Sequence, residues 1–236
     1  MENEDFLNVI SKSFNTFLNV GTSRSTAKLK DLHGAIAKDL ADKLGNEYKV
    51  SSQGYGDDKE AKIEGRYIDK MVDITISKDN KPVAGIAVKF VMQNYKQNSN
   101  NYFENMLGET ANIRCSNVPY FQVFIVFDKL PYYDNSGVLK HWELFNANNS
   151  HKYIILSNDD TKISLHTPDK TLLYVVHLPD NESLLGKKKS EYMDYYKTSD
   201  TKITLSSNDL GKHGNSLIVN DWATFRDKVY HAIMAI

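Results

Sequence analysis

A carboxylate and a lysine stand inside two neighbouring apolar segments of this 236-residue chain. Asp73 interrupts the alternating segment 70–77, and Lys89 interrupts the segment 83–91. Because strand side chains alternate between faces, each charged residue would lie opposite its apolar neighbours. Enclosing such charges is unfavourable unless a partner satisfies them. A divalent cation held by carboxylates, with a lysine near an attacking water, would satisfy them.

The elements around these residues follow from hydrophobic periodicity. Apolar residues at three- and four-residue steps predict helices over 5–18 and 25–44, with a break and an N-cap at 21–25. Alternation predicts three strands, and a nearly continuous apolar run predicts a strand buried on both faces. The predicted elements that follow are strands 62–67, 70–77 and 83–91, a helix over about 101–114, and strand 119–127.

This order, together with Asp73 and the segment 85–90 (GIAVKF), resembles the PD-(D/E)xK nucleases, the fold of many type II restriction endonucleases. The segments 101–114 and 119–122 resemble a group of bacterial restriction-type proteins. The resemblance covers about residues 25–128. It implies an α/β (α+β) fold with a mixed sheet flanked by helices, in which Asp73 binds Mg²⁺ and Lys89 orients or activates water.

The sequence departs from that family at Ala87, where the family places an acid two residues before the lysine. Some members supply this carboxylate from the following helix, which here offers Glu104 and Glu109. With Phe103 at 0° and about 100° per residue, the apolar face points near 20°, Glu104 near 100° and Glu109 near 240°. We therefore expect Glu104 before Glu109 as the further catalytic and metal-binding carboxylate. Glu64 is a third candidate.

Each of these residues also has a structural interpretation. Asp73 could pair with a basic residue, and both helix glutamates could be solvated. Arg114 could stabilise a helix C-terminus or contact a phosphate. The run Lys187, Lys188 and Lys189, near several tyrosines, could be a solvated loop or a DNA-backbone contact.

His33 and Cys115 are expected to be structural. His33 is interpreted as a satisfied histidine at the border of the helix 25–44. Cys115 has no activating neighbour in the sequence, and we expect a small buried side chain there.

Composition narrows the class of protein. The chain has 41% hydrophobic and 25% charged residues, which is typical of a globular protein. A net charge of −1 gives no overall basic field, and a single cysteine excludes an internal disulfide or a multi-cysteine zinc site. No P-loop, GxGxxG, HExxH or GxSxG pattern occurs. No apolar run is long enough for a membrane span, so we expect a bacterial cytoplasmic protein without membrane partners.

The C-terminal half is less regular. Strands are expected over 152–156, 162–166 and 171–178, and a final helix near Asn220 or Asp221. We expect one domain over 1–236, with a core of about 25–128. The segment 129–236 would be a β-rich elaboration for DNA recognition or dimerisation.

The resemblance implies an Mg²⁺-dependent endonuclease of double-stranded DNA, expected to be a sequence-specific type II restriction enzyme. Base recognition on a palindromic site favours a homodimer, and a cognate DNA methyltransferase would protect the host genome. Ala87 keeps open a non-catalytic module that binds nucleic acid or protein. A nuclease for branched or damaged DNA in repair or recombination would share the chemistry.

Overall fold

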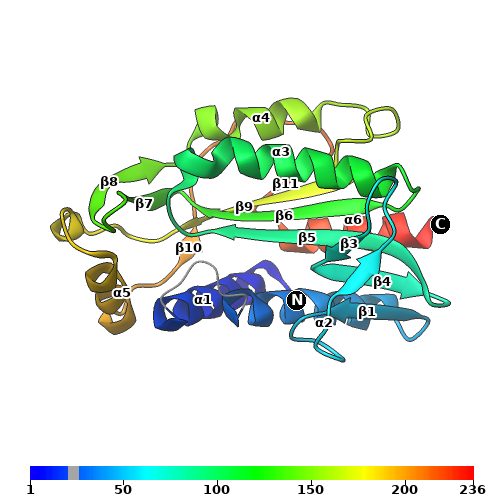
Figure 1. Cartoon of the computed structure of the whole chain (residues 1–236), viewed down its shortest axis with the longest axis horizontal. Helices are drawn as coiled ribbons and strands as arrows, with labels where there is room; N and C mark the ends of the chain where they lie inside the picture. The colour runs from blue at the N-terminus through cyan, green and yellow to red at the C-terminus, as the bar shows by residue number, and fades with distance from the viewer. Residues whose placement is uncertain (21–26) are drawn as a thin grey trace.

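A mixed β-sheet runs through the middle of the molecule (Figure 1). The computed structural model describes residues 1–20 and 27–236, so the predicted break and N-cap at 21–25 lie outside the described residues. The strand order is β1, β4, β5, β6, β9 and β10, with β11 also paired to β9. These strands are β1 (Tyr48–Ser52), β4 (Ile74–Lys78), β5 (Lys81–Val91), β6 (Tyr120–Phe127), β9 (Lys170–His177), β10 (Thr204–Leu205) and β11 (Leu217–Val219).

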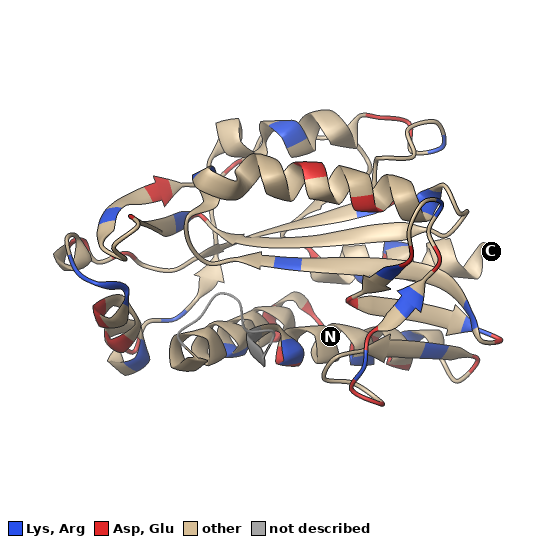
Figure 2. Cartoon of the chain, in the orientation of Figure 1, with Lys and Arg blue, Asp and Glu red and all other residues tan. Residues whose placement is uncertain are grey.

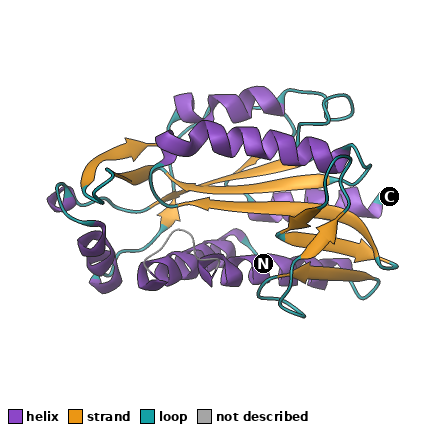
Figure 3. Cartoon of the chain, in the orientation of Figure 1, coloured by secondary structure: helices purple, strands orange, loops and turns teal. Residues whose placement is uncertain are grey.

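Helices cover both faces of this sheet. They are α1 (Asn3–Val20), α2 (Ala27–Leu44), α3 (Tyr95–Arg114), α4 (Ala147–Ser157), the 3₁₀ turn η1 (Glu182–Leu184), α5 (Lys189–Thr198) and α6 (Trp222–Met234). β5, β6 and β9 run parallel, with α3 in the first connection and α4 in the second. Right-handed crossovers that advance in one direction place their helices on one face. Accordingly, α3 and α4 lie together on one side, and α1 and α2 lie on the other (Figures 1 and 3); α6 packs against α1 and α2.

The centre of the sheet is the most apolar part of the chain. All eight residues of β6 are buried, as expected of a parallel strand with helices on both faces. This confirms the predicted strand 119–127, and β9 confirms the predicted strand 171–178. The ring of Phe6 in α1 stacks on that of Trp222 in α6, with centroids 4.5 Å apart. The two ends of the chain therefore share the core.

The first half shows the predicted order of helix, three strands, helix and strand, with one exchange. The antiparallel strands are β1, β4 and β5, so β1 takes the place predicted for 62–67. That segment contributes only β2 (Ala61–Ile63), which pairs with β3 (Lys70–Val72) in a separate hairpin. The predicted strand 70–77 is divided at Asp73, because its two halves pair with different partners.

The second half corrects more of the predictions. The segment 152–156 lies in α4, and 162–166 forms turns, so neither is a strand. The Asn146 side chain accepts the N–H of Asn148, and the Asn149 side chain accepts the N–H of Asn146. This capping starts a helix where the apolar, β-branched run alone favoured a strand. The final helix is confirmed, with the Asp221 side chain capping its first turn.

Several elements of the second half were not predicted. They are the hairpin of β7 (Lys129–Tyr133) and β8 (Leu139–Leu144), and the elements η1, α5, β10 and β11. The segment 129–236 is therefore mixed helix and strand rather than simply β-rich. Among the described residues, no helix is both long and apolar enough to cross a membrane.

Candidate active site

A pocket of about 320 Å³ opens where β4 begins and β5 continues beyond it. Residues of α2, β5, α3 and β6 line it together with Asp73, the residue between β3 and β4. The lining residues are Leu29, Asp73, Ala87, Val88, Lys89, Tyr102, Asn105, Met106, Glu109, Gln122 and Phe124. Three sequence-predicted site residues, Asp73, Lys89 and Glu109, thus face one cavity from three different elements.

Asp73 is held in place by the bend between β3 and β4. Its carbonyl oxygen accepts the Ser52 hydroxyl at 2.8 Å, and its Oδ2 accepts the N–H of Val88 at 2.7 Å. The Ile74–Ile86 pair is the first in the β4–β5 register, and Val88 lies two residues farther along β5. The carboxylate therefore takes a β5 donor that β4 no longer reaches, and its orientation is fixed.

Lys89 projects from β5 at the mouth of the pocket. It is an exposed residue of an otherwise buried strand end, and its Nζ lies 4.6 Å from the centroid of the Tyr102 ring. Partial burial lowers the pKa of Lys89, while Asp73 and Glu109 act in the opposite direction. The ammonium group therefore interacts electrostatically with both carboxylates and remains accessible from solvent.

The structure reverses the order expected for the two helix glutamates. Glu109 lines the pocket, forms an ion pair with Lys70, and acts on the pKa of Asp73. Glu104 is exposed and does not line the pocket. Glu64, the third candidate, is also exposed and follows β2 outside this pocket.

The reversal arises because α3 has two apolar sides. Its buried Met106, Thr110 and Ile113 lie near 300° on the scale used above, at about 100° per residue. Phe103 instead turns toward α4, where its ring meets that of Tyr153 with centroids 5.3 Å apart. The expected core direction near 20° was an average over both sides of the helix, and it lies about 80° from the side that is buried against the sheet. This average placed Glu104 ahead of Glu109.

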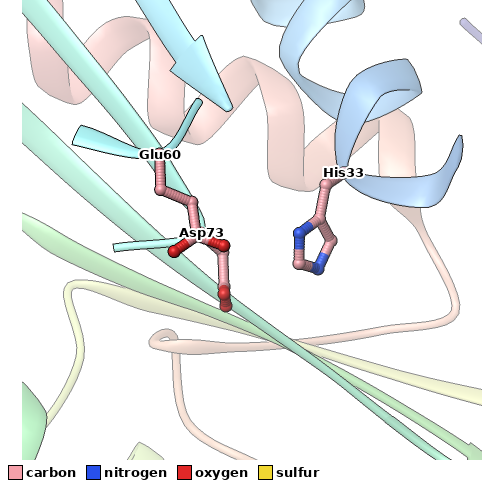
Figure 4. A group of neighbouring side chains, drawn as sticks. All are labelled: His33, Glu60 and Asp73. Atoms are coloured by element: carbon pink, nitrogen blue, oxygen red, sulfur yellow. The ribbon is translucent and has the colours of Figure 1, made fainter. Parts of the chain in front are cut away.

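A second group of ligands adjoins Asp73. Ligand atoms of His33 in α2, Glu60 before β2, and Asp73 all lie within 4.8 Å of one another. Figure 4 shows the His33 ring reaching from α2 toward the two carboxylates. Gln53 donates to Glu60 Oε1 at 2.8 Å and fixes that side chain. These residues could hold a metal ion together.

His33 is the principal correction to the sequence interpretation. Its side chain is only 4% exposed, and neither ring nitrogen has a hydrogen-bond partner within residues 1–20 and 27–236. The expectation of a satisfied histidine is therefore wrong. Its position four residues after Leu29 on the buried stripe of α2 was a usable signal. The sequence around Glu60 gave no comparable signal for a ligand, because this segment is a turn-rich connection without periodicity.

Burial controls the protonation of this group. It raises the pKa of Asp73 from 3.8 to about 6, and Glu109 adds to the rise, whereas the Val88 N–H, Lys70 and Lys89 oppose it. Burial also lowers the pKa of His33 from 6.5 to about 4, against the effect of Glu60. At neutral pH the imidazole is thus uncharged, with a lone pair available to a cation.

Arg114 has a different role from the phosphate contact considered above. Its guanidinium donates to the carbonyl oxygens of Thr161, Ser164 and Thr167, and pairs with Asp169 at 3.0 Å. The side chain is 10% exposed. Arg114 therefore fixes the loop before β9, and the predicted phosphate contact does not fit this geometry.

The lysine run lies away from the pocket, at the start of α5 and at the opposite end of the sheet from β3 and β4 (Figure 1). Lys187 pairs with Glu191, Lys188 donates to the Ser136 carbonyl, and Lys189 lies over the Phe17 ring. Figure 2 shows basic and acidic residues interspersed along the chain. The run is thus engaged locally, and any contact with DNA there would be remote from Asp73.

Cys115 is half-buried at the C-terminal end of α3.

No protein-family model, curated protein or solved structure matches this chain. The functional interpretation therefore rests on the chemistry of the pocket and of the ligand group beside it.

Proposed function

We propose that this chain is a divalent-metal-dependent endonuclease that hydrolyses phosphodiester bonds of double-stranded DNA. The observation that carries the proposal is the convergence of Asp73, Lys89 and Glu109 on one pocket from a strand bend, a neighbouring strand and a crossover helix. Two carboxylates and a lysine beside a cavity suit metal-assisted attack of water on a phosphate.

The residues present fit a divalent cation. Asp73 and Glu60 offer oxygen atoms, and His33 offers an uncharged nitrogen that is buried and unpartnered among the described residues. Oxygen ligands suit Mg²⁺, and an added imidazole suits Mn²⁺ better than it suits Mg²⁺. We therefore propose that the site accepts both ions and binds Mn²⁺ more tightly.

The catalytic roles follow from the positions of the side chains. A bound divalent cation would lower the pKa of a coordinated water and offset charge on the phosphate. Asp73, which is fixed by the Val88 N–H just before β4 begins, would hold the cation. Lys89 places its ammonium group at the pocket mouth, where it binds a phosphate oxygen or orients the attacking water. Glu109 faces the same cavity, paired with Lys70.

More specifically, we propose a restriction endonuclease-like core with type II restriction activity. The resemblance of residues 25–128 to the PD-(D/E)xK nucleases supports this. We propose a homodimer on a palindromic site, protected in its host by a cognate methyltransferase. The segment 129–236 would then help to read bases. A nuclease of branched or damaged DNA has the same site and differs in substrate.

The proposal is tested by incubating the full chain with unmethylated phage DNA and either Mg²⁺ or Mn²⁺, beside an EDTA control. Asp73→Ala and Lys89→Ala should abolish cleavage. The helix provides a matched pair, because Glu109 faces the pocket and Glu104 does not. Glu109→Ala should reduce cleavage at least tenfold, and Glu104→Ala should leave it unchanged.

Discrete fragments from the wild type alone would support a sequence-specific endonuclease. Cleavage confined to branched substrates would favour the repair or recombination enzyme. A folded protein that binds no Mn²⁺ and cuts none of these substrates would refute the nuclease. Ala87 makes the non-catalytic binding module the alternative that such a result would favour.

A further inference from the structure

The segment 52–54, at the end of β1, contacts two of the three residues in the ligand group beside the pocket. The Ser52 hydroxyl donates to the carbonyl oxygen of Asp73 at 2.8 Å, and the Gln53 amide donates to Oε1 of Glu60, also at 2.8 Å. Ser52 is buried and Gln53 is half-buried. Two consecutive residues therefore hold the two members of the group that carry carboxylates.

The same segment lies against the backbone of α2, beside the third member of the group. A Cβ atom on Gly34 would come 2.3 Å from the carbonyl oxygen of Gly54, and one on Gly54 would come 2.1 Å from the carbonyl oxygen of Lys30. Only glycine at both positions allows this approach. Because Lys30 and Gly34 lie on either side of His33 in the chain, the contact sets the position of α2 at that histidine.

His33 depends on this packing for its orientation. A histidine that binds a metal usually donates from its other ring nitrogen to a fixed acceptor. Neither ring nitrogen of His33 has a hydrogen-bond partner within the described ranges, so packing rather than hydrogen bonding places the ring. An ion pair of Lys30 with Asp58, whose other carboxylate oxygen accepts the N–H of Gly54, also ties α2 to the segment.

We propose that the segment 52–54 positions the ligands of the metal site, with Gln53 orienting Glu60 and the contact of Gly54 with Gly34 seating His33. This inference rests on the proposed function, because it concerns the same divalent cation. The Gln53 bond uses one lone pair of the Glu60 carboxylate and leaves the others to the cation. Without that bond the side chain would occupy several rotamers, and ordering it would weaken metal binding.

The test measures Mn²⁺ binding to the full chain by isothermal titration calorimetry and by the electron paramagnetic resonance signal of free Mn²⁺. Gln53→Met keeps the length of the side chain and removes the donor. It should lower the Mn²⁺ affinity about 10- to 100-fold, the loss typical when a group that orients a metal ligand is removed. In EDTA it should melt within about 5 °C of the wild type, since one hydrogen bond is lost.

A double-mutant cycle shows whether Gln53 acts through Glu60. Glu60→Ala alone should weaken Mn²⁺ binding, and adding Gln53→Met should weaken it no further, because the group that Gln53 orients is gone. In the His33→Ala chain, by contrast, Gln53→Met should still cost about tenfold or more. Gln97→Met is the matched control, since Gln97 also forms a side-chain hydrogen bond, with Asn94 at 3.2 Å at the start of α3. It should bind Mn²⁺ as the wild type does.

The contact between α2 and the segment 52–54 has its own variant. Gly34→Ala adds a Cβ atom against the Gly54 carbonyl, so the helix and the segment must separate. The Mn²⁺ affinity should fall about tenfold or more, because His33 moves with the helix. Wild-type affinity in this variant would overturn the seating role of the contact. Gln53→Met leaves the backbone packing intact, so it tests the proposal even where Gly34→Ala fails to fold.

The outcomes distinguish this inference from the proposed function. Equal Mn²⁺ affinity of Gln53→Met and the wild type would overturn the role of Gln53, and so would an equal loss in the presence and absence of Glu60. A wild type that binds no Mn²⁺ would overturn the metal site and the inference together. A wild type whose Mn²⁺ affinity depends on Gln53, but which cuts no DNA, would refute the nuclease and support the inference.

Discussion

Replacing Asp73 by asparagine should stabilise the metal-free protein while it destroys the proposed site. Burial raises the pKa of this carboxyl from 3.8 to about 6 in the folded chain. Asparagine has nearly the same shape, keeps an oxygen for the Val88 N–H, and carries no charge to bury. The perturbation therefore removes mainly the unfavourable burial of a carboxylate.

The sign and size of the effect follow from proton linkage. Between pH 3.8 and about 6, folded Asp73 keeps a proton that the unfolded chain has released, so folding stability falls as pH rises through this window. The two pKa values are separated by about two pH units, at about 1.36 kcal/mol each. Above pH 6, Asp73→Asn should thus gain up to about 3 kcal/mol in unfolding free energy.

The assay is urea unfolding of both chains in EDTA, from pH 4 to pH 8. A gain of about 3 kcal/mol corresponds to a midpoint about 1 M higher in urea. The advantage of the variant should shrink toward zero near pH 4. His33 is present in both chains and titrates in an overlapping window, since burial lowers its pKa from 6.5 to about 4.

A largely exposed carboxylate provides the control. Asp57 pairs with Lys49 across 3.3 Å, and its side chain is 79% exposed. Asp57→Asn should change stability by less than about 0.5 kcal/mol at every pH. An Asp73→Asn chain that is less stable than wild type at pH 8, or whose advantage does not depend on pH, would refute the burial argument.

Four other perturbations follow from the same structure. Mn²⁺ at about 100 times its Kd should stabilise the wild type by about 2.7 kcal/mol in thermal melts, and His33→Ala should lose most of this gain. Lys89→Met should lose cleavage by more than about 100-fold yet bind Mn²⁺ normally in calorimetry, because Lys89 is no metal ligand. Asn112→Ala should cost about 1–3 kcal/mol in urea unfolding, since the Asn112 side chain bonds the backbone of the loop 65–68 three times. Arg114→Met should also destabilise the fold by several kcal/mol, through the carbonyls and the aspartate it leaves unpaired; an unchanged stability with weaker DNA binding would contradict the structural role assigned to it.

Much of the framework could be read from local patterns. The helices α1 and α2 have apolar residues at helical spacing, and the strands β5, β6 and β9 are alternating or nearly continuous apolar segments of strand length. Alternation in two neighbouring strands was also enough to place Asp73 and Lys89 on one side of the sheet, and both line the same pocket. These features depend on residues close together in the chain.

Other features depended on contacts that no local pattern encodes. The segment 152–156 has the composition of a strand, yet capping by Asn146 and packing against α3 make it helical. Glu109 rather than Glu104 reaches the pocket because α3 packs on the sheet and on α4 at once. A single apolar direction on a helical wheel cannot represent two packing partners.

The sequence by itself determined the central strands β5, β6 and β9 and the pair Asp73 and Lys89, because strand periodicity fixes which side chains share a face. Only the tertiary structure brought His33 and Glu60 to Asp73 and set the segment 52–54 beside them. These residues come from a helix, a turn-rich connection, a strand bend and the end of β1. Their meeting depends on strand register and on the packing of α2 at the sheet, which are decided by the whole core.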